Sequence, residues 1–342
     1  MPIIVRVLSF CLLCWQLSHM VEAKAESEDP ENDSPRLIAS ESPFQAKAGP
    51  MAQRGTFWRP ALSLLLPGFD QHLAHQFDYG LSYSGLYLLS SWWAEDRHKA
   101  VSIFEDSQIY RHMSEAEKEN LRTHDERYKQ RTLANQFILF SGGLSAYHSF
   151  RTSVRSHQAY GGYEFLRQEE SPGEILLAPF RFEYLTRPTT LLPLALISGL
   201  AILDANTKHQ DYRRDPLNSS DLFYTGMISY NAGTYEEAMF RGWLMPLMME
   251  GTGSEFWSNF LQSGIFAAAH LNQISMPYTQ FALGFYLGWL TQQSDWTISE
   301  SIFIHAWWDV VALSIQYSNR KQKANKDLQP VVYWLPALKL AF

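Results

Sequence analysis

The sequence predicts an all-α fold, a polytopic bundle of transmembrane helices with a charged helical loop outside the membrane. The main observation is a series of apolar segments without Asp, Glu, Lys or Arg. They cover residues 79–94, 132–150, 188–203, 222–235 and 256–294, and a further apolar segment starts at Ser301. Several are shorter than the roughly 20 residues of an isolated membrane span, but helices inside a bundle tolerate polar ends. Residues 256–294 are long enough for two helices, which we expect to be separated around residues 272–277.

The N-terminus has the pattern of a secretory signal peptide. Arg6 precedes an apolar run over residues 7–17, and small residues suitable for cleavage follow around Ala23. We therefore predict a signal peptide over residues 1–23, with an uncleaved anchor as the alternative. Residues 24–56 are rich in Glu, Ser, Pro and Ala, which predicts a disordered tether.

An accessory membrane segment is predicted over residues 57–185. Its first apolar patch ends in Pro-Gly-Phe-Asp-Gln at residues 67–71, which we interpret as a helix hairpin. Within the segment, residues 95–131 carry mixed charges, for example in Glu115–Arg122. Interleaved charges at helical spacing are typical of a solvated helix, so this stretch is predicted to be the charged loop.

Composition excludes several kinds of function. The chain has two cysteines, Cys11 and Cys14, both in the predicted signal peptide. Without a thiol in the mature protein, a Cys nucleophile, a disulfide framework and a thiolate metal site are excluded. A Ser-His-Asp triad with Ser263 or Ser301 lacks the Gly-x-Ser-x-Gly elbow. The net charge of −7 and the lack of a basic stripe between aromatic residues predict no nucleic-acid partner.

Three motifs place ionisable side chains inside the apolar segments. They are Glu236-Glu237-x-x-x-Arg241, Phe266-x-x-x-His270 and His305-x-x-x-Asp309. A four-residue step puts both side chains on one helical face. Such a Glu/Arg pair is usually a solvated surface, and a single His is usually a core residue. Ionisable groups are costly in apolar surroundings, however, so three motifs together indicate an intramembrane active site.

In this order on successive hydrophobic helices, the motifs resemble the CPBP family. This family comprises CAAX prenyl proteases of the type 2 class and their bacterial Abi or lysostaphin-resistance-like relatives. The resemblance predicts a protease domain over residues 186–317, followed by a C-terminal tail over residues 318–342. It implies a multi-pass protein of the cell membrane, in the bacterial inner membrane, that contacts lipid and hydrolyses a peptide or protein substrate.

The resemblance also implies a role for each motif residue. Glu236 and His270 would activate the attacking water, His305 and Asp309 would stabilise the oxyanion, and Glu237 and Arg241 would orient and charge-balance the first helix. At the last position Asn would supply an amide donor, whereas an ionised Asp only accepts hydrogen bonds. Asp309 could therefore orient His305, carry a proton or bind a metal.

No cofactor is firmly predicted, and three alternatives remain. Glu236, His270, His305 and Asp309 form an acceptable ligand set for Zn²⁺ or another divalent metal, although the spacing is not His-Glu-x-x-His. A non-catalytic membrane scaffold or immunity-type binding protein of the same fold is favoured by Asp309 and opposed by five other buried ionisable groups. A proton-coupled transporter would predict an inverted repeat, and the sequence has none that we detect.

Overall fold

The computed structural model describes residues 55–159, 161–207, 212–271 and 278–321. The predicted signal peptide, nearly all of the predicted tether and most of the predicted C-terminal tail lie outside these ranges. The described part of the chain is helical, as the sequence predicts. Its helices in chain order are α3 (Gly55–Leu65), α4 (Phe69–Leu73), α5 (Phe77–Glu105), α6 (Gln108–Arg111), α7 (Glu115–His124), α8 (Glu126–Gln158), α9 (Pro172–Leu177), η1 (Ala178–Phe180), η2 (Phe182–Thr186), α10 (Pro188–Thr207), α11 (Ser219–Met239), η3 (Phe240–Leu244), α12 (Met245–Thr252), α13 (Glu255–Ala269), α14 (Tyr278–Gln293) and α15 (Ser299–Ser318).

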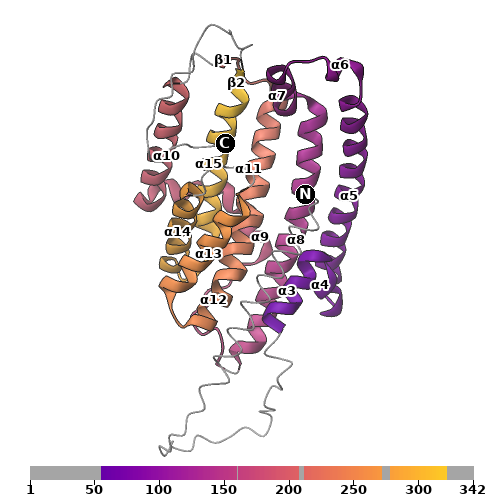
Figure 1. The fold of residues 1–342 in the computed structure, drawn as a ribbon. Helices are drawn as coiled ribbons and strands as arrows, with labels where there is room; N and C mark the ends of the chain where they lie inside the picture. The colour runs from indigo at the N-terminus through magenta and orange to yellow at the C-terminus, as the bar shows by residue number, and fades with distance from the viewer. Residues whose placement is uncertain (1–54, 160, 208–211, 272–277, 322–342) are drawn as a thin grey trace, which may run out of the picture.

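The long helices α5, α8, α11, α15 and α10 stand side by side as a bundle (Figure 1). Short helices α3, α4 and α12 gather at one end, and α6 and α7 lie at the other. Helices α13 and α14 pack against each other, and α14 also contacts α15. Among the residues described, no single helix is both long and apolar enough to cross a membrane.

The stretch predicted as a charged loop is helical. Helix α5 continues to Glu105, α6 and α7 follow, and α8 begins at Glu126. Helix α7 starts with a capping box, in which Ser114 Oγ accepts from the Glu117 amide and the Glu117 carboxylate accepts from the Ser114 amide at 2.8 Å. No residue of α7, which is described throughout, is buried, so this helix is solvated as its charge pattern predicts.

Two short strands, which the sequence did not predict, accompany the helices. β1 (Tyr212–Arg214) pairs antiparallel with β2 (Asn319–Lys321), with Arg213 opposite Arg320. The chain entering α11 passes beside the chain leaving α15, and the Asp215 amide donates to the Ser318 carbonyl at 2.8 Å. Extended backbone satisfies its N–H and C=O groups by hydrogen bonds to a second strand. No local sequence pattern predicts which segment that strand will be.

The predicted helix hairpin at residues 67–71 is a turn between α3 and α4. Gly68 has φ +89°, and a Cβ there would lie 2.4 Å from the Gly80 carbonyl oxygen, so only glycine fits. Asp70 and Gln71 are buried against α8. Ser149 Oγ donates to Asp70 at 2.7 Å, and Gln71 Nε2 donates to the Ser145 carbonyl at 3.0 Å. The turn therefore anchors the N-terminal helices to the centre of the bundle.

A break divides residues 256–294 into two helices, as predicted. Helix α13 ends at Ala269 and α14 begins at Tyr278, while residues 272–277 lie outside the described part. Helix α11 also ends in a widened turn, because η3 is π-helical. Pro246 follows this turn, and its ring would clash with a regular helical carbonyl at Gly242.

Helices α11 and α15 approach most closely at a glycine. A Cβ on Gly233 would lie 2.8 Å from the backbone nitrogen of Ala306 and 2.9 Å from its Cα. Glu237 lies one turn further along α11, and His305 adjoins Ala306. The approach at Gly233 therefore sets how near the two motif helices come to each other.

We expect Gly233→Ala to destabilise the protein by about 1–3 kcal/mol, because the new methyl group collides with the backbone of α15. Gly226→Ala on the same helix is the matched control, since a Cβ there has no neighbour within 4 Å. Alanine favours a helix over glycine by about 1 kcal/mol, so the control should be neutral or stabilised. Thermal unfolding of the purified variants, followed by circular dichroism, measures both. Equal melting temperatures would contradict this account of the helix crossing.

Candidate active site

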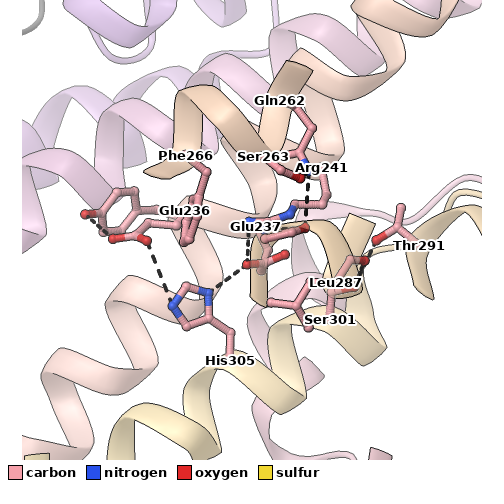
Figure 2. A network of polar contacts seen from close by, with 12 residues as sticks. Glu236, Glu237, Arg241, Gln262, Ser263, Phe266, Leu287, Thr291, Ser301 and His305 are labelled. Carbon is pink, nitrogen blue, oxygen red and sulfur yellow. Dashed lines mark hydrogen bonds and ion pairs between the residues drawn. The ribbon is translucent and has the colours of Figure 1, made fainter. Parts of the chain in front are cut away.

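The three sequence motifs lie on elements that meet inside the bundle. Glu236 and Glu237 lie in the last turn of α11, and Arg241 lies in η3. His270 follows α13 directly, and His305 and Asp309 lie on α15. Figure 2 shows the His305 ring between the carboxylates of Glu236 and Glu237. The structure thus brings together side chains that are up to 73 positions apart, from Glu236 to Asp309.

Four of these side chains turn polar atoms toward one another, and we call the region between them the shared space. Glu236 Oε2 lies 3.7 Å from His270 Nε2 and 3.9 Å from His305 Nε2. Asp309 Oδ2 lies 3.7 Å from His305 Nε2. These separations are too long for direct hydrogen bonds, but they suit polar groups bridged by one water molecule.

Glu237 and Arg241 form a buried ion pair beside this space. Arg241 Nη1 lies 2.9 Å from Glu237 Oε1, and both side chains have 0% exposure. Arg241 Nη2 donates to the Gly284 carbonyl of α14 at 3.0 Å, and the guanidinium stacks 4.5 Å from the Phe266 ring centroid. This pair is completely buried. The side chains of Glu236, His270 and Asp309, by contrast, are 12%, 18% and 24% exposed.

Each histidine is oriented through its Nδ1 atom. His305 Nδ1 lies 2.7 Å from Glu237 Oε1, and His270 Nδ1 lies 2.8 Å from the Phe266 carbonyl oxygen. Carboxylate and carbonyl oxygens only accept, so both Nδ1 atoms carry the proton. Each Nε2 atom therefore faces the shared space, as a proton acceptor in the neutral ring and as a donor in the imidazolium.

The orientation of His305 differs from one option that the sequence left open. Asp309 could have oriented this ring, but its nearest oxygen is 3.7 Å from Nε2, beyond hydrogen-bond distance. Glu237 holds the other ring nitrogen instead. Asp309 therefore borders the shared space directly.

Tyr235 is a site residue that sequence reasoning missed. Its hydroxyl donates to Glu236 Oε1 at 3.0 Å, and its ring is buried between α8 and α11. Glu236 Oε2 is buried and has no hydrogen-bond partner among the described residues. Tyr235 thus fixes one carboxylate oxygen and leaves the other facing the histidines.

A polar cluster on α13 was also not predicted. Gln262 Nε2 donates to the Gly284 carbonyl at 3.3 Å, the same oxygen that accepts from Arg241, and Asn259 Nδ2 donates to the Phe285 carbonyl at 2.9 Å. Buried amides spaced three residues apart on an apolar helix were the available signal. They attach α13, which carries His270, to α14.

Two carboxylates fix the start of α15. Glu170 accepts from the amides of Ile298 and Ser299, at 2.5 and 3.1 Å. Glu300 accepts from Thr189 Oγ1 and Thr190 Oγ1, at 2.9 and 2.7 Å. A carboxylate at a helix N-terminus also complements the helix dipole. The helix that carries His305 is therefore held along its axis.

The serine alternative finds no support in the contacts. Ser263 Oγ donates to the Asn259 carbonyl at 2.7 Å. Ser301 Oγ lies 2.9 Å from Thr291 Oγ1 and donates to the Leu287 carbonyl at 3.1 Å. Neither hydroxyl contacts a histidine through these bonds. As for a metal, the described ranges contain no group of three or more His, Cys, Asp or Glu side chains arranged to hold an ion.

Comparison with known proteins agrees with the motifs. The family model described as "Rce1-like: Type II CAAX prenyl endopeptidase Rce1-like" matches residues 218–311, the segment that contains the whole polar cluster. No curated protein and no solved structure matches significantly. The resemblance predicted from the three motifs is therefore confirmed over residues 218–311, which are similar to the Rce1-like family of type II CAAX prenyl endopeptidases.

Proposed function

We propose that the protein is an intramembrane endopeptidase that hydrolyses peptide bonds of membrane-associated substrates. Its nucleophile is a water molecule activated by Glu236 and His270. The observation that carries this proposal is the convergence of Glu236 Oε2 and two histidine Nε2 atoms within 3.9 Å, in a partly exposed space. The family is one of peptidases, so its members act on peptide or protein substrates.

Glu236 is placed to act as the general base. Water bound between Oε2 and His270 Nε2 gives a proton to the carboxylate while its oxygen adds to the substrate carbonyl carbon. The resulting tetrahedral intermediate carries a negative oxygen. When the C–N bond breaks, the proton held by Glu236 passes to the leaving amine, which restores the carboxylate.

His305 is placed to stabilise the oxyanion. Its Nδ1–H is held by Glu237, so Nε2 points a donor into the space only when the ring is an imidazolium. The carboxylates of Glu237 and Asp309 lie on either side of the ring. A fixed positive donor of this kind stabilises charge that develops in the transition state.

Exposed apolar side chains support a membrane location. On α5 and α10 they include Leu81, Leu88, Leu89, Trp92, Leu191, Leu192, Leu196, Ile202 and Leu203. Exposed apolar surface of this extent is typical of contact with lipid or with a partner. We propose the multi-pass arrangement in a bacterial inner membrane that the sequence predicts, with these side chains toward lipid.

A non-catalytic scaffold of the same fold is the second candidate, and Asp309 is the feature that favours it. The buried pair of Glu237 and Arg241 would serve a scaffold equally well. A scaffold has no use, however, for the position of Glu236 Oε2, which lies 3.7 and 3.9 Å from the Nε2 atoms of His270 and His305 without a direct hydrogen bond to either. A buried acceptor left unbonded lowers stability, and its place near two histidines supports a chemical role.

Two variants separate chemistry from folding. Glu236→Gln keeps the size of the side chain but removes the base, so cleavage should fall by roughly 10²–10⁴-fold at unchanged protein abundance. Arg241→Ala leaves a buried carboxylate without its guanidinium, at a cost of about 3–5 kcal/mol, and should lower abundance as well as activity. Membrane proteomes of cells carrying each variant would be compared for a peptide that accumulates uncut. Equal loss of abundance in both variants would favour the scaffold.

Tyr235→Phe tests how Glu236 is positioned. The variant loses a hydrogen bond to a charged group but keeps the buried ring, so kcat should fall about tenfold with little change in KM. Steady-state kinetics on the peptide identified from the proteome comparison would measure both constants. An unchanged kcat would show that Tyr235 does not position the base.

Asp309→Asn distinguishes a metal-free mechanism from a metal-dependent one. If Asp309 borders the oxyanion, the amide supplies a donor and activity should persist or rise. If Asp309 binds a metal, the same change removes a charged ligand and should weaken metal binding and activity together. Both proteins would be assayed with and without a chelator. Chelator-sensitive activity that is lost in the variant would overturn the proposed glutamate mechanism.

A further inference from the structure

A cleft lies at the C-terminal end of α8. Its volume is about 160 Å³. It is lined by Arg151, Val154, Arg155, Gln158, Glu164, Leu166, Arg167 and Glu169. None of these residues belongs to the three motifs, so the proposed peptidase chemistry does not account for the cleft.

The chain after α8 is fixed in place around this cleft. Gln158 Nε2 donates to the carbonyls of Leu166 and Tyr163, at 2.9 and 3.2 Å. The Tyr163 amide donates to Glu250 of α12 at 3.1 Å, and the Tyr163 and Leu166 side chains are buried. Since these contacts come from both sides, the cleft is preformed.

Among the charged residues that line the cleft, Arg151 is the buried one. Its side chain is nearly buried, at 8% exposure, and Nη2 donates to the Gln168 carbonyl at 2.7 Å. A guanidinium has five N–H donors, so one carbonyl leaves most of them available. In the described part of the chain, none of its nitrogens is both buried and unpartnered. The remaining donors are therefore reachable from the cleft that Arg151 lines.

The lining carries an excess of positive charge. Arg155 lies one turn beyond Arg151 on α8 and is paired with Glu169. That pair is neutral as a unit, which leaves Arg151 and Arg167 against the single carboxylate of Glu164. A nearly buried guanidinium in such a lining favours an anion that accepts several hydrogen bonds at once.

We propose that this cleft binds a phosphate group, with Arg151 and Arg167 as its principal donors. Guanidinium groups match phosphate oxygens in bidentate geometry, and a tetrahedral phosphate can accept from donors on several sides. The same chemistry is offered by a phospholipid headgroup and by inorganic phosphate. The small volume suits such a group and excludes a nucleotide.

The test uses the purified full-length protein in a phosphate-free detergent and follows its thermal unfolding. Three probes are titrated, namely inorganic phosphate, dioctanoyl phosphatidylglycerol and dioctanoylglycerol, which is a similar lipid without the phosphate. Ligands that bind only the folded state raise the melting temperature in a saturable way. We expect saturable stabilisation by at least one of the two phosphate-bearing probes and none by dioctanoylglycerol.

Arg167→Gln removes an exposed donor and should leave the fold intact. The variant should bind the effective phosphate-bearing probe about tenfold more weakly, as expected for the loss of one charge-assisted hydrogen bond. Arg111→Gln is the matched control, because Arg111 is 65% exposed on α6 and does not line the cleft. It should bind like the unmodified protein.

Each outcome decides the proposal. Stabilisation by inorganic phosphate assigns a soluble phosphate, and stabilisation by the phospholipid alone assigns a headgroup. Equal stabilisation by dioctanoylglycerol, no stabilisation by any probe, or an Arg167→Gln variant that binds normally would overturn it. Because peptidase activity is not measured, the result does not depend on the proposed function.

Discussion

The site depends on the contacts that the buried Glu237 carboxylate makes with Arg241 and His305. One of its oxygens, Oε1, lies 2.9 Å from Arg241 Nη1 and 2.7 Å from His305 Nδ1. A carboxylate with 0% exposure is stable only with such partners, because an unpaired buried charge costs several kcal/mol. Arg241 also donates a hydrogen bond to the Gly284 carbonyl, which attaches α14 to the same ion pair. One buried charge therefore fixes α11, η3, α14 and α15 relative to each other.

Local patterns in the sequence predicted much of this arrangement. The four-residue steps from Glu237 to Arg241 and from His305 to Asp309 define helical faces, and the apolar surroundings indicate that those faces are interior. The charge pattern of α7 predicted its solvated state, and the length of residues 256–294 predicted two helices. Each of these inferences uses residues within a few turns of each other, where helical geometry alone fixes the relation.

The sequence could not supply the contacts between distant elements. Glu237 and His305 are 68 positions apart, and Glu170 caps α15 from 129 positions away. The bond from Tyr235 to Glu236 was not predicted, since it depends on how the Tyr235 ring packs against α8. The pairing of β1 with β2 was missed for the same reason. Such contacts arise from packing, and no local propensity encodes them.

The two adjacent glutamates meet two different requirements. One balances buried positive charge and the other can accept a proton, and a single side chain could not do both. Successive residues of a helix point about 100° apart. Glu237 is fully buried and its Oε1 is paired with both Arg241 and His305, whereas Glu236 is 12% exposed and its Oε2 lies 3.7 Å from His270 Nε2, beyond hydrogen-bond distance. A carboxylate that balances buried cations cannot also accept a proton without breaking that balance. Glu237 can therefore hold the architecture in one charge state, while Glu236 remains free to change its own, as the proposed mechanism requires.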